Sequence, residues 1–349
     1  MQQLELFRRK DLEEDVPLRN GIIYITDECW DLCEFEQKLL GCQQLGFDIE
    51  TYGELPLDGL RWWRGKIRLM QFSFSEKECY VLDWLKLSEA TKKHLLPTIK
   101  LVLESYEVEK WAFNGKFECC FCIGQLGIHP RNFRDPMLMS QLLYTGLKTL
   151  RHNLEACCDR YLQIQLDKDE QNSNWGEPDL MNKQINYAAM DAMILWPLTA
   201  ALKKRIKAEK LTYQAKLECL FMHVLAEMQC NGFPVSSEYI EKAIADHEAY
   251  SKKMTQPFYE TFPNLSITTP HPKMTHILNE HFGIGLLSTE DAELSLCKDI
   301  PEIKAIADYR SIKKHLDYLK GMQLNCRNER AYSDFRQLTG FGRTSSSRM

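Results

Sequence analysis

Two acidic residues at the end of an apolar run are the first feature of this chain that could do chemistry. The run at residues 45–47 leads directly into Asp48-Ile49-Glu50. In a β-strand, residues two apart point to the same face, so Asp48 and Glu50 would lie side by side. Neighbouring carboxylates repel each other unless a cation lies between them, and oxygen ligands suit hard ions such as Mg²⁺ or Mn²⁺. An exposed strand end would look the same, so further acids must join the pair to specify a metal site.

Three later segments could supply these further side chains. The segment 113–118, Phe-Asn-Gly-Lys-Phe-Glu, is typical of a strand end followed by a helix start, and Glu118 is its acid. The segment 133–137 contains Asp135. In the segment 187–192, Tyr-Ala-Ala-Met-Asp-Ala, the residues Tyr187 and Asp191 are four apart and therefore share one face of a helix.

The order of these motifs, D-x-E, N-x-K-F-acid, D-x-M and Y-A-A-x-D-A, resembles that of the DEDDy 3′–5′ exonucleases. This family includes the proofreading domain of bacterial DNA polymerase I and ribonuclease D. The resemblance covers roughly residues 20 to 205. It implies an α/β, ribonuclease H-like fold and two-metal hydrolysis of phosphodiesters by two Mg²⁺ or Mn²⁺ ions. It also implies a set of site residues, with Asp48, Glu50, Glu118 and Asp191 near the metals, Tyr187 orienting the attacking water, Asn114 and Phe117 supporting the second-motif turn beside the nucleic acid, and Asp135 in a structural role.

Glu118 departs from the family pattern, which carries Asp at this position. The extra methylene extends the carboxylate by roughly 1.5 Å, one C–C bond length. A misplacement of about 1 Å can cost about a hundredfold in rate. Two interpretations therefore stay open: an exonuclease that is active but slow, and an impaired exonuclease fold that serves as a DNA-binding or polymerase-partner module.

The elements that must position these residues follow from periodicity and turn signals. Short apolar runs predict strands, three of them consecutive, which indicates an antiparallel meander within a mixed sheet flanked by helices. The 180–202 helix contains Pro197, which predicts a kink or a break. The predicted strands are 21–25, 45–51, 66–73, 78–83 and 110–113. The predicted helices are 29–40 with an N-cap at 26–28, one from about residue 90 with Leu95, Ile99 and Leu103 on one face, 114–126, 135–142, 150–162 and 180–202.

A shift to helical composition near residue 208 predicts three parts: a tail at 1–20, an exonuclease domain at 21–208 and a second domain at 209–349. Predicted helices in the last part are 211–230, 237–261, 272–281 and 299–324. The segments 231–235 (NGFPV) and 342–346 (GRTSS) resemble the mainly α-helical thumb of a family A DNA polymerase, incomplete and ending before the palm motifs. This resemblance implies no polymerase activity from this chain alone. A truncated, a split and a naturally short protein all stay open, as does a separate palm and fingers chain as a partner.

Two groups of cationic and aromatic residues are candidates for nucleic-acid contacts. Trp62, Trp63 and Arg64 could stack on and hold a single strand, since base–aromatic stacking is worth about 1–3 kcal/mol per base. Packing of both tryptophans in the core is the alternative. Lys313, Lys314 and Arg343 could contact duplex backbone, whereas a solvated helix face is the simpler interpretation of the two lysines.

Composition narrows the class of protein. Among 349 residues, 44% are hydrophobic and 27% charged, with a formal net charge of −5 that argues against a general polyanion binder. The 13 cysteines, several adjacent, favour a reducing compartment and lack zinc-finger spacing. No signal peptide or membrane-spanning run is apparent, so we expect a cytoplasmic protein. The expected substrate is a single-stranded DNA or primer–template 3′ end, with ribonuclease D-like RNA trimming as the alternative.

Overall fold

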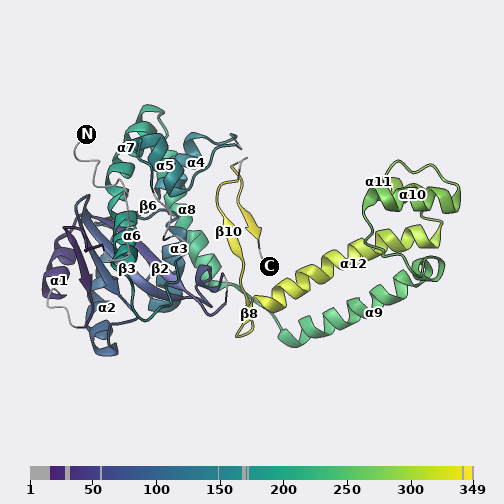
Figure 1. Ribbon diagram of the computed structural model, residues 1–349, viewed down its shortest axis with the longest axis horizontal. Coiled ribbons are helices and arrows are strands. Elements are labelled where there is room, and N and C mark those ends of the chain that lie inside the picture. Colours follow the sequence, from purple (N-terminus) through teal and green to yellow (C-terminus); the bar gives the residue numbers. More distant parts are fainter. Residues whose placement is uncertain are drawn as a thin grey trace. The chain divides into compact units, whose positions relative to one another are not determined.

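The structure is a computed structural model that describes residues 16–27, 32–55, 57–147, 149–166, 170, 173–339 and 342–347 (Figure 1). The chain divides into two compact units. The first unit comprises residues 1–231 and 335–345, and the second comprises residues 232–334 and 346–349.

A mixed six-stranded sheet organises the first unit, with strand order β1-β4-β3-β2-β5-β6. The three central strands β2, β3 and β4 are antiparallel, and β1 and β5 join them in parallel, which confirms the predicted meander within a mixed sheet. The edge strand β6 pairs in parallel with β5. The strands are β1 (Ile22–Ile25), β2 (Gln44–Tyr52), β3 (Lys66–Ser75), β4 (Glu78–Asp83), β5 (Glu109–Trp111) and β6 (Phe133–Arg134).

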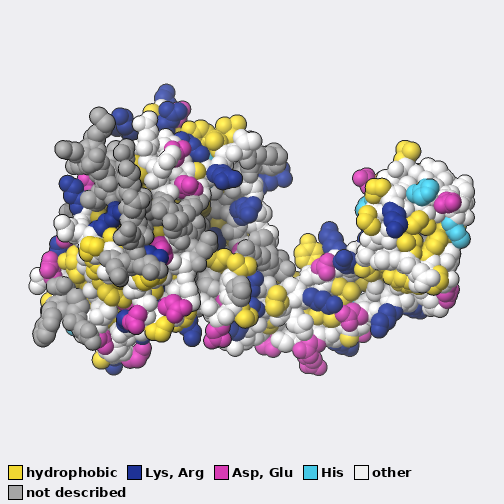
Figure 2. Space-filling model, viewed as in Figure 1, with side chains coloured by type: hydrophobic (Ala, Val, Ile, Leu, Met, Phe, Trp, Pro, Cys, Tyr) yellow, Lys and Arg dark blue, Asp and Glu magenta, His cyan; other side chains and the backbone are white. Residues whose placement is uncertain are grey.

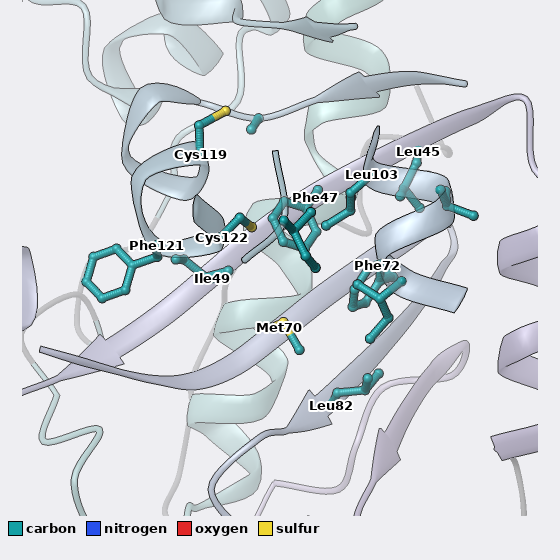
Figure 3. Close-up of a cluster of buried hydrophobic side chains, with 14 of the residues drawn as sticks. Leu45, Phe47, Ile49, Met70, Phe72, Leu82, Leu103, Cys119, Phe121 and Cys122 are labelled. Carbon is teal, nitrogen blue, oxygen red and sulfur yellow. The ribbon is translucent and has the colours of Figure 1, made fainter. Parts of the chain in front are cut away.

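Helices cover both faces of this sheet. One face packs against α1 (Leu32–Gly41), α2 (Glu89–Glu104) and α3 (Lys116–Phe121), and Phe47, Ile49 and Phe72 project into this cluster (Figure 3). The other face packs against α4 (Pro136–Leu143), α5 (Leu154–Leu162), α6 (Asn182–Met193) and α7 (Leu195–Ala208). Because side chains alternate along β2, Asp48, which lies between Phe47 and Ile49, faces the second group of helices.

Local signals explain where several helices begin or end. Ser88 caps α2 by accepting a hydrogen bond from the Thr91 amide (3.2 Å), and Asn153 caps α5, so this helix begins at Leu154 rather than at residue 150. The predicted 180–202 helix breaks at Ile194, and Pro197 is the third residue of α7, where its missing N–H costs no intrahelical bond. The predicted 114–126 helix changes to a π-helical turn at Cys122–Leu126. Part of the predicted 26–28 cap lies outside the described residues.

The helix α8 (Thr212–Asn231) belongs to the first unit, because it packs against α3 and its Met222 and Ala226 join the sheet cluster. The compact unit therefore extends to Asn231, beyond residue 208, where the composition shift predicts a domain boundary, and that boundary stays a prediction. Gly232, with φ +56°, follows α8 at the predicted helix end. The segment 335–345 returns to this unit, where the Gln337 side chain donates a hydrogen bond to the Glu218 carbonyl (2.7 Å).

The second unit is mainly helical, as predicted. Its long helices α9 and α12 lie side by side (Figure 1), and Phe258, Ile303 and Ile306 are buried in its core. Acidic and basic side chains are interspersed over this unit in Figure 2. Its helices and short sheet strands are α9 (Ser237–Thr261), α10 (His271–Phe282), α11 (Asp291–Leu294), α12 (Pro301–Leu324), β7 (Phe233–Pro234), β8 (Cys326–Arg327) and β9 (Arg330–Ala331), and β10 (Asp334–Arg336) and β11 (Ser345–Ser347) follow.

The stretch Asn182–Ala208, which forms α6 and α7, is long and apolar enough by composition to cross a membrane, with a hydropathy of 1.2. Within it, 67% of the most apolar window is buried inside the first unit. A core helix of a folded domain shows the same properties, so this stretch is weak evidence for a span. The expectation that the chain has no membrane partner stays a prediction.

Candidate active site

The strand β2 presents Asp48 and Glu50 toward α6. Gly46, two residues earlier on the same face, lies so close to α6 that a Cβ atom there would be 2.6 Å from the Ala192 carbonyl oxygen. Phe47 and Ile49 point into the opposite cluster. The strand alternation predicted from the D-x-E motif is therefore confirmed and puts both acids on the sheet face toward α6. Of the two, Asp48 lines the cavity described below and Glu50 does not.

The helix α6 brings Tyr187 and Asp191 to the same place. A cavity of about 400 Å³ is lined by Asp48, Asn114, Tyr187 and Asp191. Gln184 fixes the start of α6, because its side-chain oxygen accepts a hydrogen bond from the Met181 amide (2.9 Å). Three motifs that are far apart in the sequence thus meet at one cavity.

Glu118 reaches the site from α3 as a buried side chain with only 3% of its surface exposed. Its Oε2 atom has no hydrogen-bond partner among the residues that the structure describes. Burial, and next the negative charge of Asp48, raise the pKa of Glu118 well above its usual value. Burial, and next the charge of Asp191, likewise raise the pKa of Asp48. Asp48 therefore lies in electrostatic contact with two other carboxyl groups, and a cation would relieve the repulsion on both sides.

Asp135 holds the turn that positions Glu118. Its carboxylate accepts hydrogen bonds from the amides of Asn114 (3.1 Å) and Gly115 (3.0 Å), and it caps α4 by accepting one from the Met137 amide (2.8 Å). Asn114 adopts a left-handed conformation, with φ +62°, within this turn. Burial raises the pKa of Asp135 to about 7 despite these bonds. These contacts support the structural role predicted for Asp135.

Phe117 packs against Phe121, with ring centroids 4.9 Å apart, and is half-buried. It supports the turn between β5 and α3 and does not line the cavity. Asn114 is exposed and does line it. Asn114 and Phe117 share one predicted role, but in the structure only Asn114 of the two lines the cavity.

The acidic residues fit oxygen-liganded divalent ions. All the candidate ligand groups are carboxylates, and Glu118 Oε2 is a buried acceptor that receives no hydrogen bond from the described part of the chain. Within the described ranges, no three His, Cys, Asp or Glu side chains converge tightly enough to enclose a metal by themselves. Mg²⁺ is commonly held by one or two carboxylates together with water and substrate phosphates, so such an enclosure is not required.

The structure corrects the stacking role predicted for Trp63. This ring is 7% exposed and packs edge-on against Trp62, so it presents no face to a base. Trp62 is half-buried and covers Gly124, where a Cβ atom would lie 2.0 Å from the indole ring. Arg64 forms an ion pair with Asp58 (3.5 Å). The core-packing interpretation holds for Trp63, and a nucleic-acid role for Trp62 and Arg64 stays a prediction.

The other basic candidates lie away from the carboxylates in the sequence. Lys313 and Lys314 are exposed on α12 of the second unit, beside a shallow cavity of about 320 Å³ that is also lined by Asp317 and Tyr318. Arg343 is exposed in the 335–345 segment, which belongs to the first unit. Their contact with nucleic acid stays a prediction.

The sequence did not indicate several residues of the cavity, because they are apolar and resemble core positions. Phe113, Met137, Leu154 and Leu166 form apolar walls around the carboxylates. Glu155, in the first turn of α5, is a further acid on the same cavity. Asn153 also lines the cavity, and as an N-cap residue it is the one unpredicted cavity residue with a sequence signal, since it indicates where α5 begins.

Comparison with known proteins agrees with this geometry. The family model described as 3′–5′ exonuclease matches residues 23–207. DNA polymerase I of Aquifex aeolicus is 28% identical over 350 residues, which covers 93% of this chain and 56% of the relative. Ribonuclease D of Desulfotalea psychrophila is 25% identical over 193 residues, which covers 55% of this chain and 47% of that protein. The chain therefore spans about half the length of these relatives.

Two solved structures show the same fold. The POL domain of Pol1 from M. smegmatis, in complex with DNA primer-template and dNTP, matches 93% of this chain and 54% of its own, with a TM-score of 0.74 at 14% identity. Brucella melitensis NrnC matches 61% of this chain and 94% of its own, with a TM-score of 0.51 at 24% identity. The predicted ribonuclease H-like α/β fold with a helical second part is thus confirmed.

Proposed function

The chain belongs to the 3′–5′ exonuclease family of DNA polymerase I-type proteins, and from this premise we propose that it is a proofreading-type exonuclease. It removes nucleotides from the 3′ end of single-stranded DNA and releases nucleoside monophosphates. The observation that carries this proposal is the meeting of Asp48, Tyr187 and Asp191 at one cavity, with the charge of Asp48 acting on the buried Glu118.

The site residues have three proposed roles: metal binding, orientation of the attacking water and exclusion of bulk water. Asp48, Glu50, Glu118 and Asp191 would hold two Mg²⁺ or Mn²⁺ ions. When bound, such ions supply charge stabilisation for the attacking and leaving oxygens of the phosphodiester. Tyr187 carries its hydroxyl one helical turn before Asp191 and orients the attacking water. The apolar walls exclude bulk water around the terminal nucleotide, which strengthens these electrostatic interactions.

The second unit favours DNA as the substrate. The DNA polymerase I of Aquifex aeolicus matches 93% of this chain and so covers both units, whereas ribonuclease D matches 55% of this chain. Lys313 and Lys314 on α12, together with Arg343, would contact the phosphate backbone of a primer–template. Ribonuclease D-like trimming of RNA is the second candidate, which the sequence match to that enzyme supports. Binding of a separate palm and fingers chain as a partner also belongs to the proposal.

The first experiment measures shortening of a 5′-labelled single-stranded DNA oligonucleotide with Mg²⁺, with Mn²⁺ and with chelator. We expect stepwise 3′ shortening only with a divalent ion. Asp191→Asn should reduce the rate at least about a hundredfold, and Tyr187→Phe should reduce it about tenfold or more. Asp159→Asn is the matched control, because Asp159 is exposed on α5 and does not line the cavity.

Two outcomes would redirect the proposal. Absence of product with either ion, in a folded protein that binds the oligonucleotide, would favour the impaired module that Glu118 suggests. Faster shortening of RNA than of DNA of the same sequence would favour the ribonuclease D-like alternative.

Loss of primer–template affinity in the double variant Lys313→Ala, Lys314→Ala, but not in Lys252→Ala, Lys253→Ala on α9, would support the thumb-like role of α12.

A further inference from the structure

A buried arginine on the central sheet lies outside the family motifs. Arg68, on β3, has a fully buried side chain, and its Nη2 atom is 2.9 Å from the carboxylate of Asp83, which is also fully buried. The hydroxyl of Tyr24 donates a second hydrogen bond to the same Asp83 oxygen. A buried ion pair costs desolvation free energy, and an apolar pair of similar volume often gives equal or greater stability. Stability alone therefore does not explain this arrangement.

The guanidinium group of Arg68 also binds the chain segment that leads into α6. Its Nη1 donates hydrogen bonds to the carbonyl oxygens of Trp175 (3.3 Å) and Glu177, and its Nη2 donates one to the carbonyl of Pro178 (3.2 Å). Residues 173–181 form no helix or strand. Carbonyl groups inside a protein need hydrogen-bond donors, so one side chain provides much of the internal anchorage of this segment.

The anchored segment contacts the site through Trp175. This ring is buried, and its centroid lies 6.3 Å from that of Tyr187, at an interplanar angle of 45°. The contacts therefore run from Asp83 to Arg68, from Arg68 to the Trp175 backbone, and from the Trp175 ring to Tyr187. Arg68 does not line the cavity, so it would act on the reaction only through these neighbours.

We propose that Arg68, oriented by Asp83, is a positioning residue that fixes the Trp175–Pro178 segment and thereby the ring of Tyr187 against the cavity. This proposal rests on the proposed exonuclease function. A planar guanidinium has several donors in a rigid fork and can bind the carboxylate and three carbonyls together. A lysine is a point charge without this fork, so Arg68→Lys keeps the charge and removes the geometry.

The test is a double-mutant cycle on the hydrolysis of single-stranded DNA. We expect Arg68→Lys to lower kcat at least tenfold while KM changes less than twofold, because substrate binding does not use this residue. The same substitution in a Tyr187→Phe background should change kcat less than twofold, since the hydroxyl that it positions is gone. Arg205→Lys is the matched control, because Arg205 is exposed on α7 and pairs with Glu209.

A second readout does not depend on activity. Amide hydrogen exchange in residues 173–181 should be faster in Arg68→Lys than in the wild type, and unchanged in the β2 strand. Guanidinium ion at millimolar concentration should restore part of the lost kcat in Arg68→Ala, with Asp83 holding the added cation. A loss of kcat that is equal in the Tyr187→Phe background, or unchanged exchange in 173–181, would overturn the proposal. If the wild type hydrolyses no substrate, the proposed function fails, and the exchange measurement alone decides the anchoring role.

Discussion

Gly46 lies where α6 crosses β2, and we predict that a single methyl group there separates the two halves of the site. A Cβ atom at this position would be 2.6 Å from the Ala192 carbonyl oxygen and 3.2 Å from the Ser73 Cβ atom. Both neighbours belong to regular elements, β3 and α6, so neither can rotate away. Ala192 is next to Asp191, and Gly46 is two residues before Asp48 on the same face.

The expected magnitude follows from these distances. Ordinary contact begins at 3.4 Å, so α6 and β2 must separate by about 0.8 Å to accept the methyl group. A shift of about 1 Å between reacting groups costs about a hundredfold in rate, so we expect Gly46→Ala to lower kcat about 30- to 100-fold. Overpacking of this kind destabilises a protein by about 1–3 kcal/mol, which leaves most domains folded.

The assay is single-turnover shortening of labelled single-stranded DNA at saturating Mg²⁺ or Mn²⁺, with urea unfolding measured in parallel. Gly41→Ala is the control, because nothing lies within 4 Å of the added methyl group at the end of α1. A folded Gly46→Ala protein with the wild-type rate would refute the reasoning that the α6–β2 contact sets the distance between the carboxylates. An equal loss of rate in Gly41→Ala would refute it as well.

Three further substitutions test the surroundings of the site. Glu118→Gln should raise the free energy of unfolding without divalent ions by about 0.5–2 kcal/mol, because it removes a buried acid next to Asp48, and should abolish hydrolysis, as urea titration and the DNA assay would show. Asp135→Ala leaves three amides without an acceptor and should cost about 3 kcal/mol in urea unfolding. Burial lowers the pKa of His223 to about 4, and its Nε2 accepts the Phe133 amide (3.3 Å), so stability present above pH 6.5 is lost as the pH falls toward 4. His223→Gln should flatten this dependence, which has a slope of up to about 1.4 kcal/mol per pH unit.

Companion variants or measurements show which result would contradict each of these three predictions. Glu118→Asp, which shortens the side chain by about 1.5 Å, is the companion to Glu118→Gln and should keep or raise the rate, so an inactive Asp variant would count against a metal-holding carboxylate. Asp135→Asn keeps the cap acceptor and should lose less stability than Asp135→Ala. A His223→Gln protein whose unfolding free energy between pH 4 and 6.5 parallels that of the wild type would contradict a neutral buried imidazole.

Local sequence determined the elements and which side chains share a face. Strand alternation placed Asp48 with Glu50, and helical spacing placed Tyr187 with Asp191, because a side chain's direction depends only on the dihedrals of its own element. Cap residues set the starts of α2, α4, α5 and α9 for the same reason. The order of the motifs, through its resemblance to a known family, also predicted the exonuclease fold.

The tertiary structure decided those features that no local sequence pattern predicts. The burial of Trp63 and Glu118, the placement of α8 in the first unit, the apolar walls of the cavity and the anchoring of residues 175–178 by Arg68 all depend on segments distant in the chain. An apolar or charged residue looks the same in a sequence whether it packs inside or lies at a site. Its role is set by the free energy of the long-range packing that surrounds it, and that packing exists only when the sheet and its helices have assembled.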